Sequence, residues 1–255
     1  LRLSKGSAGR VAVIGGTPSY TGAPYFGSIS ALKTGADLVY VFTSSHASLA
    51  IKSYSPELIV HPILEDPSFV ETFNERLNTF TSLIIGPGLG RPGDVLTEES
   101  FNKIIQIIKQ RHLPAIFDAD AVSFVSKNPS IIQGYKEAIL TPNFREFKRL
   151  YTAVLGTEFP KDAAEVDDQA MKELASKLGN VTICCKNFND KITDGNVVVI
   201  NDFNHTPRRC GGQGDIMSGI MGTFTHWTHQ TYLNPKGEMT QSKVQPGFTP
   251  TILAA

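Results

Sequence analysis

A chain of 255 residues is long enough for one large domain or two small ones, with a sizeable hydrophobic core. Its 41% hydrophobic and 19% charged residues exclude wholesale disorder, and equal numbers of basic and acidic side chains, 24 each, disfavour a nucleic-acid-binding protein. Because no apolar run approaches the roughly 20 residues of a membrane span, we expect a globular protein with no nucleic-acid partner and no membrane partner.

Short apolar, β-branched runs alternate with amphipathic stretches along the whole chain. The runs predict strands at 11–14, 38–42, 83–85, 115–117, 138–140, 181–184 and 197–200. Several runs are apolar without alternation, as strands buried on both faces are. Helical spacing of apolar residues lies between them, for example over 101–108 and 170–178. This alternation predicts a single α/β domain over 1–255, with a parallel sheet covered by helices.

The two ends and the cysteines bear on what surrounds this domain. The chain begins at Leu1 and stops in 251–255, which reads as an interrupted apolar element, so we expect the domain to be incomplete at both ends. Two of the three cysteines, Cys184 and Cys185, are adjacent. This pattern cannot form the disulfide framework of a secreted protein and indicates a reducing compartment. We expect the cytoplasm, or also the mitochondrion if a targeting segment precedes Leu1.

Ligands of parallel sheets bind beyond the carboxyl ends of the strands, so the loops there are the candidate sites. The first loop, 15–24, reads GGTPSYTGAP, and its glycines allow the backbone to approach a ligand before a helix that we expect near Ala23. An ordinary flexible loop is the alternative. The loop lacks the G-x-G-x-x-G fingerprint, which disfavours a Rossmann oxidoreductase. The loop 86–91, GPGLGR, again has three glycines, although Gly-Pro is also common in turns.

Acidic residues follow two of the later strands. Asp118 and Asp120 could bind a metal directly or through water, or Asp118 could cap the next helix, and we favour a structural or indirect role for at least one of them. Asn143 and Glu146 fit the first and last positions of a capping box, which would explain both. They also share one helical face at i, i+3, so Glu146 is a candidate to orient hydrated Mg²⁺.

The segment 208–219, RRCGGQGDIMSG, is the most specific in the chain. Three glycines precede a helical pattern, so several unpaired amides at a helix start can hold a transferring phosphoryl group. Asp215 lies at the mouth of this anion hole, where a carboxylate can accept a proton from an attacking hydroxyl. The alternative is that Asp215 only stabilises the helix start through the dipole, but a glycine-rich run would be a costly choice for that alone, so we favour a catalytic role.

Two spaced motifs resemble the ribokinase-like superfamily: Asn143-x-x-Glu146, and Gly212-x-Gly214-Asp215. Five segments, VAVIGGTPSYTGAP, IIGPGLGR, FDADAV, LTPNFREFKRL and RRCGGQGDIMSG, are similar in this order to the eukaryotic ATP-dependent (S)-NAD(P)H-hydrate dehydratases, over roughly residues 5–230. The resemblance implies a ribokinase-like fold, a mostly parallel sheet with helices on both faces. It also implies a nucleotide repair enzyme, a carbon–oxygen lyase that restores hydrated NADH or NADPH with ATP as co-substrate, Mg²⁺ as cofactor, and ADP and phosphate as products.

The resemblance further implies which residues form the site. It makes Asp215 the catalytic base, and it makes Glu146 the residue that holds the metal through water. It places the hydrated nicotinamide nucleotide at Ala23, Gly88, Asn143, Phe144, Arg145, Glu146, Phe147, Lys148, Arg149 and Asp215. It places ATP at Lys186, Asn187, Phe188, Asn189, Asp190, His205, Thr206, Pro207, Arg208, Arg209, Cys210, Gly211, Gly212, Gln213 and Gly214.

One departure from the family and two rival functions remain open. The family usually has Lys-Gly where this chain has Lys186-Asn187, and because Asn tolerates left-handed backbone we expect the turn to survive. A kinase of a small hydroxymethyl compound would use Asp215 and the glycine loop but stop at the phosphoester. A non-catalytic nucleotide sensor would be expected to lack the carboxylate of Asp215. A homo-oligomer is also open.

Overall fold

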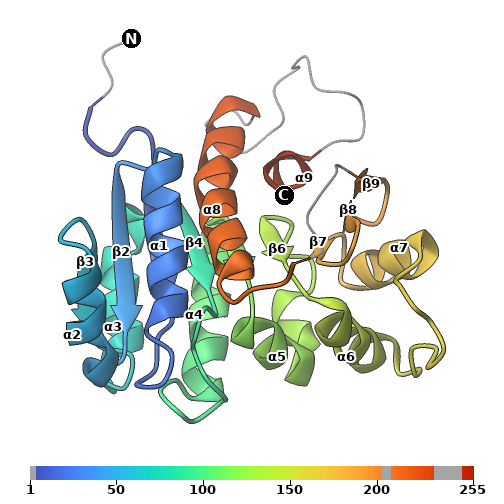
Figure 1. The fold of residues 1–255 in the computed structure, drawn as a ribbon, viewed down its shortest axis with the longest axis horizontal. Helices are drawn as coiled ribbons and strands as arrows, with labels where there is room; N and C mark the ends of the chain where they lie inside the picture. The colour runs from blue at the N-terminus through green and yellow to red at the C-terminus, as the bar shows by residue number, and fades with distance from the viewer. Residues whose placement is uncertain (1–3, 203–207, 233–248) are drawn as a thin grey trace.

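The computed structural model describes residues 4–202, 208–232 and 249–255. Its centre is a nine-stranded sheet in the order β3-β2-β1-β4-β5-β6-β7-β8-β9 (Figure 1). Strands β1 to β7 pair in parallel, and β8 and β9 complete the edge as an antiparallel hairpin. This arrangement confirms the mostly parallel sheet. The strands are β1 (Arg10–Ile14), β2 (Leu38–Thr43), β3 (Ile59–Pro62), β4 (Ser82–Ile85), β5 (Ala115–Phe117), β6 (Ala138–Leu140), β7 (Thr182–Cys185), β8 (Asp190–Thr193) and β9 (Val198–Asn201).

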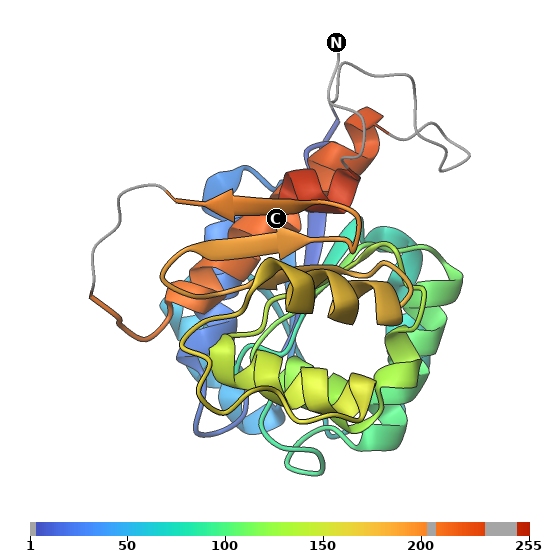
Figure 2. The ribbon, with the colours of Figure 1, turned by 90° about the vertical axis from the view of Figure 1, so that its right-hand side faces the viewer.

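Helices cover both faces of the sheet, as the resemblance implies. One face carries α1 (Gly22–Thr34), α2 (Ser45–Tyr54), α8 (Gln213–Tyr232) and α9 (Pro250–Ala254). The other carries α3 (Phe69–Arg76), α4 (Glu98–Gln110), α5 (Asp120–Lys127), α6 (Phe144–Leu155) and α7 (Asp168–Lys177), with 3₁₀ turns at Leu77–Thr79 and Pro129–Ile132. Figure 2 looks across the sheet from its β9 edge, with α1 and α8 on one side and α4 on the other. None of the helices described is long and apolar enough to cross a bilayer.

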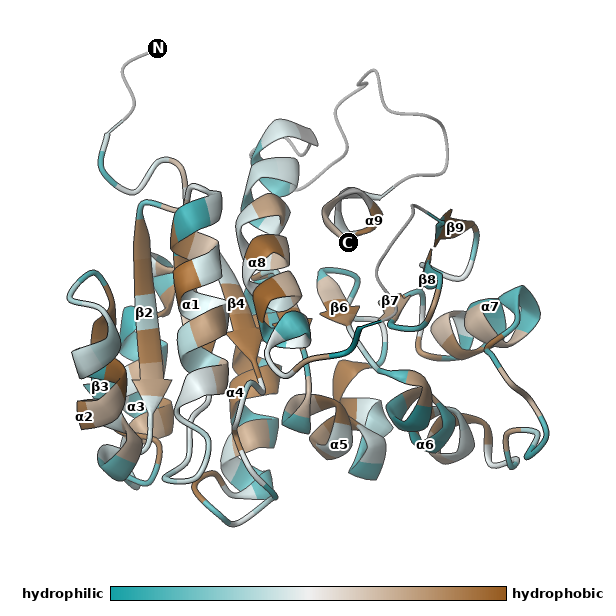
Figure 3. Cartoon of the chain, viewed as in Figure 1, coloured by the Kyte–Doolittle hydropathy of each residue, from teal (hydrophilic) through white to brown (hydrophobic). Residues whose placement is uncertain are grey.

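Apolar strands hold these layers together. Val11 and Val13 belong to the core on one face of the sheet, while Ala12 and Ile14 belong to the core on the other, and all four are fully buried. Successive strand residues point to opposite faces, so a strand covered on both sides must be apolar at every position. Figure 3 shows this as brown strands, β2 and β4 most clearly, among helices with teal outer faces. Burial on both faces therefore explains the unbroken apolar runs of the central strands, whereas the apolar edge strand β9 is partly exposed.

The predicted strands agree with the structure to within one residue at nearly every end, but two strands were missed. Strand β3 is a short edge strand that ends in Pro62, and β8 has the largely polar sequence Asp-Lys-Ile-Thr. An edge strand such as β3 tolerates proline. Strand β8 lies between β7 and β9 and is held by pairing with both, so a search for apolar runs detects neither strand.

Glycines bring α1 and α8 into close contact. A Cβ on Gly219 would lie 2.2 Å from the carbonyl oxygen of Gly27, so no side chain fits at that crossing. The second turn of α8 thereby packs directly against α1, and the loop before α8 lies beside Phe26, whose ring is 3.0 Å from the Cβ position of Gly212. This packing places the start of α8 at the carboxyl edge of the sheet (Figure 1).

Candidate active site

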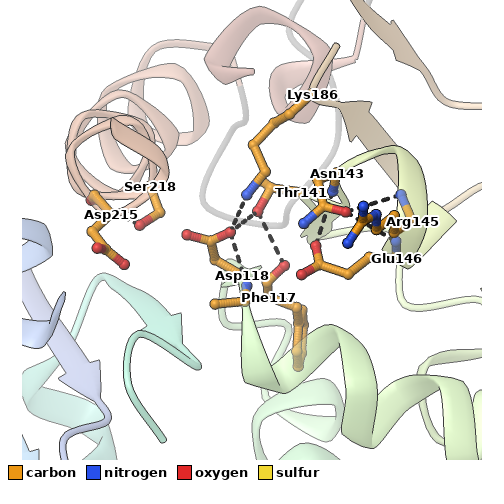
Figure 4. A network of polar contacts seen from close by, with 10 residues as sticks. Phe117, Asp118, Thr141, Asn143, Arg145, Glu146, Lys186, Asp215 and Ser218 are labelled. Carbon is orange, nitrogen blue, oxygen red and sulfur yellow. Dashed lines mark hydrogen bonds and ion pairs between the residues drawn. The ribbon is translucent and has the colours of Figure 1, made fainter. Parts of the chain in front are cut away.

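Three polar residues follow three neighbouring parallel strands. Asp118 follows β5, Thr141 follows β6 and Lys186 follows β7. The Oδ1 atom of Asp118 accepts hydrogen bonds from the Thr141 hydroxyl and from the Lys186 ammonium, each at 2.6 Å. It also accepts one from the amide of Ala119 at 2.9 Å. Figure 4 shows Asp118 between Lys186 and Asp215, so the network lies in the crevice where ligands of such sheets bind.

The Asp118–Lys186 pair is largely shielded from water. The side chain of Asp118 is 1% exposed and that of Lys186 is 22% exposed. Burial alone lowers the pKa of Lys186, but the adjacent Asp118 carboxylate, with help from Glu146, outweighs burial and raises it. Lys186 is therefore a fixed cation. The other carboxyl oxygen of Asp118, Oδ2, is buried without a hydrogen-bond partner among the described residues.

Helix α8 begins directly beside this pair. Gly212 precedes the helix with a φ of +88°, a conformation that favours glycine. A Cβ on Gly214, in the first turn, would lie 3.3 Å from Lys186 Nζ and 3.8 Å from Asp118 Oδ2. The first amides of a helix have no partner within it and attract anions. The glycine-rich start of α8 and the Lys186 ammonium therefore form one positively charged surface.

Asp215 lies in the first turn of α8, half-buried, and faces the Asp118 side of the crevice (Figure 4). Burial raises its pKa to about 6; the negative charge of Asp118 adds to this, Lys186 opposes it, and Asp120 adds a smaller contribution. A general base works best when its pKa is near the operating pH. Asp215 is therefore suited to accept a proton close to neutrality.

The start of α6 confirms the predicted capping box. The Asn143 side chain accepts hydrogen bonds from the amides of Arg145 and Glu146, and Glu146 Oε2 accepts one from the amide of Asn143 at 2.9 Å. The amide of Lys186 donates to the carbonyl of Pro142 at 2.8 Å, which ties this loop to the end of β7. Burial raises the pKa of Glu146, against the amide bond from Asn143 and the charge of Lys186.

These residues fit a magnesium ion that is held through water. Among the residues described, no group of three His, Cys, Asp or Glu side chains could hold a metal directly. Mg²⁺ usually keeps several waters and binds through one or two carboxylates together with substrate phosphates. Glu146 uses one carboxyl oxygen, Oε2, in the capping box, and its other carboxyl oxygen takes no part in that box. It can therefore orient a hydrated ion that is also bound to ATP.

We expect Glu146→Gln to separate this role from helix capping. Glutamine also serves at this position of a capping box, so the free energy of unfolding should change by less than about 1 kcal/mol. The lost charge should raise the Mg²⁺ concentration needed for half-maximal rate. A magnesium titration and urea unfolding check both. An unchanged magnesium requirement together with lost stability would make Glu146 a capping residue only.

The other residues of α6 that are predicted at the nicotinamide site differ in their burial and contacts. The side chain of Phe147 is fully buried in the core, where its ring packs against Phe159 and Tyr151, so its place at the nicotinamide site stays a prediction for its backbone alone. It lies four residues after Asn143, on the face of α6 that turns to the sheet. The Lys148 ammonium lies 4.4 Å from the ring centroid of Phe144, a cation–π contact, while Arg145 and Arg149 are exposed.

Gly88 and Ala23 lie where the first two glycine loops meet. Gly88 has a φ of +62°, and a Cβ there would lie 2.7 Å from the carbonyl oxygen of Tyr20. The carbonyl of Gly88 accepts a hydrogen bond from the amide of Gly16 at 3.1 Å. Loop packing is thus a sufficient reason for glycine at this position. Ala23, in the first turn of α1, and Gly88 stay predictions as substrate contacts.

The turn after Lys186 survives, but not in the expected way. Asn187 has no positive φ; instead its amide donates to Asp190 Oδ1 at 2.9 Å, where β8 begins. The expectation of a left-handed Asn187 was therefore wrong, because a side-chain hydrogen bond closes the turn. Phe188 is 68% exposed next to it, and Asn189 completes the turn.

The second predicted ATP segment is described only in part. His205, Thr206 and Pro207 lie outside the described residues. Arg208, Arg209 and Cys210 are exposed, and Gly211 has open space around its Cβ position. The side chain of Gln213 ties this loop to the helix, since its Oε1 accepts from the Cys210 amide and its Nε2 donates to the Arg208 carbonyl, each at 3.4 Å.

Two contacts were not predicted from the sequence. They are the ion pair between Asp118 and Lys186 and the hydrogen bond that Thr141 donates to Asp118. The expected structural role for one acidic residue fits Asp120, whose Oδ2 accepts a hydrogen bond from the amide of Gly90 at 2.8 Å. The signal for the network was present: each of its three residues is the first or second after a predicted strand. Their meeting follows only once β5, β6 and β7 are known to be neighbours.

Comparisons with known proteins identify the family of this chain. A family model described as NAD(P)H-hydrate dehydratase matches residues 11–240. An ATP-dependent (S)-NAD(P)H-hydrate dehydratase from Danio rerio is 44% identical over 251 residues, 98% of this chain and 72% of that protein. The human protein of the same name is 45% identical over 223 residues, 88% of this chain and 63% of that protein. The chain thus spans less than two thirds of the human relative.

Solved structures share the fold. A ribokinase-like superfamily protein from Enterococcus faecalis superposes with a TM-score of 0.71 at 23% identity, over 89% of this chain and 75% of that one. An ADP/ATP-dependent NAD(P)H-hydrate dehydratase from Bacillus subtilis, co-crystallized with ATP/Mg²⁺, gives 0.64 at 20% identity, over 99% and 88%. These likenesses confirm the ribokinase-like fold. With the family model and the relatives, they establish that the chain belongs to the NAD(P)H-hydrate dehydratase family.

Proposed function

We propose that this chain repairs damaged nicotinamide nucleotides, using ATP to dehydrate (S)-NADH hydrate and (S)-NADPH hydrate to NADH and NADPH with release of ADP and phosphate. The names of its relatives support this activity, as does the nucleotide bound by the Bacillus protein. The observation that carries the proposal is the position of Asp215. A half-buried carboxylate with a pKa of about 6 stands in the first turn of a helix whose glycine-rich start can hold a phosphoryl group.

The first step is phosphoryl transfer. Asp215 accepts the proton of the ring hydroxyl, whose oxygen forms a bond to the γ-phosphorus of ATP while the bond to the β-phosphate oxygen breaks and ADP leaves. The amides of Gly212, Gln213 and Gly214 and the ammonium of Lys186 stabilise the charge on the transferring group. Glu146 would hold Mg²⁺ through water, and the ion would supply further positive charge at the phosphates.

The second step is elimination. The phosphate ester is a better leaving group than hydroxide, so the ring carbon–oxygen bond breaks and the phosphate departs with that oxygen. The departing phosphate accepts a proton from the neighbouring ring carbon, and the electron pair of that carbon–hydrogen bond forms the double bond of the dihydronicotinamide. The protein's part in this step is to hold two nucleotides in register and to exclude water, for which a crevice rich in glycine leaves room.

The rate should depend on pH through Asp215. The base is active only when ionised, so kcat/KM should rise with pH through about 6 and level off above it. Initial rates from pH 5 to 8 at saturating Mg²⁺ check this. A profile that is flat over this range would show that the rate does not depend on a carboxylate with a raised pKa.

One assay tests the activity itself. Purified protein is incubated with hydrated NADH, Mg²⁺ and ATP, and the return of dihydronicotinamide absorbance is followed together with the formation of ADP and phosphate. We expect one NADH and one phosphate for each ATP consumed. A product that keeps the phosphate would identify a kinase, and binding without turnover would identify a nucleotide sensor.

Homo-oligomer formation and a cytoplasmic or mitochondrial location stay predictions.

A further inference from the structure

The ion pair between Asp118 and Lys186 is more restrained than phosphate binding alone would need. Lys186 Nζ is held 2.6 Å from Asp118 Oδ1, and that same oxygen accepts hydrogen bonds from Thr141 and from the amide of Ala119. The carboxylate is nearly inaccessible, at 1% exposure. Ala119, next to it, has a φ of +48°, a rare conformation for a residue with a side chain. The chain thus fixes this carboxylate firmly.

We propose that Asp118 is a positioning residue of the repair reaction: it holds the Lys186 ammonium against the first turn of α8, at the place where the transferring phosphoryl group of ATP is stabilised. This inference rests on the proposed function. Asp118 is a positioning residue and not a catalytic one in this proposal, because it acts on the phosphoryl group through the Lys186 ammonium.

Geometry supports the proposal from the side of the lysine. An ammonium has three donors, and Lys186 gives one of them to Asp118. The Cβ position of Gly214 is 3.3 Å from Nζ, so the ammonium lies directly over the glycine-rich turn. A flexible lysine stem has to lose side-chain freedom to hold one position. The pair with Asp118 removes that freedom before ATP binds, and preorganised charge stabilises a transition state best.

Charge balance supports it from the side of the carboxylate. An acidic residue this close to an anion hole repels ATP, so its presence is a cost to nucleotide binding that needs a reason. Its second oxygen, Oδ2, has no hydrogen-bond partner among the described residues and lies 3.8 Å from the Cβ position of Gly214. Asp118 is also the largest charge acting on Asp215, with Lys186 and Asp120 as the others. Its charge therefore reaches both the cation and the base.

Asp118→Asn separates positioning from ordinary structural support. Asparagine keeps an acceptor for Thr141 and Lys186 but removes the negative charge. ATP should bind about threefold more tightly or equally well, because one repulsive charge is gone. Turnover should nevertheless fall by about 10- to 100-fold, the size of effect seen when reacting groups are slightly misplaced. The acid limb of the pH profile should move to lower pH, because Asp215 loses its strongest acidic neighbour.

The experiment is a double-mutant cycle on the full chain with Asp118→Asn, Lys186→Met and both together. ATP affinity is measured by calorimetry, and kcat and its pH profile are measured with hydrated NADH. If Asp118 acts through Lys186, Asp118→Asn should slow the Lys186→Met enzyme by less than about twofold. If Lys186→Met alone folds poorly because it leaves the buried Asp118 carboxylate unpaired, Lys186→Gln, whose amide can still donate to that carboxylate, takes its place in both arms of the cycle. Thr141→Val is the matched control: it removes one hydrogen bond to the same oxygen, keeps both charges and should leave the pH profile in place.

The outcomes are distinct. Slower turnover without weaker ATP binding, lost in the Lys186→Met background, supports positioning. Unchanged turnover in Asp118→Asn, weaker ATP binding with unchanged kcat, or an equal slowing in both backgrounds overturns it. A shifted pH profile in Thr141→Val would assign the effect to local structure and also overturn it. If the unaltered protein does not restore NADH, it is the proposed function that fails.

Discussion

Asp215→Asn is expected to slow turnover by about 10²–10⁴-fold while ATP and the hydrated nucleotide still bind. Asparagine has nearly the same shape as aspartate but cannot accept the proton of the ring hydroxyl. Single-turnover rates with NADH absorbance as the readout, together with equilibrium binding of each nucleotide, measure both parts. Near-normal turnover would show that the carboxylate serves the helix start and not the chemistry.

The same variant has a stability signature of definite sign. The folded-state pKa of Asp215, about 6, lies above its ordinary value of 3.8, so between these values the folded chain binds more protons than the unfolded chain. The free energy of unfolding contributed by this group therefore falls as pH rises through that window. At pH 7 Asp215→Asn should be more stable by about 1–2 kcal/mol, and the gain should vanish near pH 4. A pure helix-dipole role predicts the opposite sign, a loss of stability at pH 7.

Gly212→Val is expected to reduce kcat/KM for ATP by about 10²-fold or more, the cost of losing a backbone donor to a developing charge. The φ of +88° is unfavourable for a β-branched residue, and the added Cβ would lie 3.0 Å from the ring of Phe26. The loop must shift, and its amides leave the phosphate. We expect a stability loss of about 1–2 kcal/mol, too little to unfold an ordinary domain. Steady-state kinetics and circular dichroism test the two effects separately.

Gly211→Val is the matched control for stability. Gly211 precedes Gly212, has no positive φ, and has no heavy atom within 4 Å of its Cβ position. Its free energy of unfolding should change by less than about 0.5 kcal/mol. If Gly212→Val lost its fold while the folded fraction still bound and used ATP normally, the loop would be structural and its glycines would have no part in phosphate binding.

Local patterns in the sequence predicted local structure well. The apolar run at 11–14 and its neighbours became buried strands, since each run must satisfy two covered faces. The capping box at Asn143 and Glu146 followed from their spacing, because its hydrogen bonds span only three residues. Strand β8 could not be predicted this way, since its register comes from pairing with β7 and β9 and not from its own polar side chains.

Long-range contacts and residue-level site roles were harder. The contact of Asp118 with Lys186 joins residues 68 positions apart and depends on the order β5-β6-β7, which no single segment contains. Phe147 was assigned to the site as part of a continuous segment, yet helical periodicity turns that one side chain into the core. Asn187 keeps the expected turn, but through a hydrogen bond from its amide to Asp190 and not through left-handed backbone. A family resemblance assigns a whole segment to a site, whereas packing determines which side chains of that segment are exposed there.

Isotope labelling tests the central claim, that the ring hydroxyl attacks ATP and leaves as phosphate. Hydrated NADH carrying ¹⁸O at the ring hydroxyl is incubated with the protein, ATP and Mg²⁺, and the inorganic phosphate and the water are analysed for the label. Phosphoryl transfer to the hydroxyl followed by carbon–oxygen cleavage predicts one ¹⁸O atom in each inorganic phosphate formed together with NADH. Unlabelled phosphate, with the ¹⁸O released as water, would contradict the account.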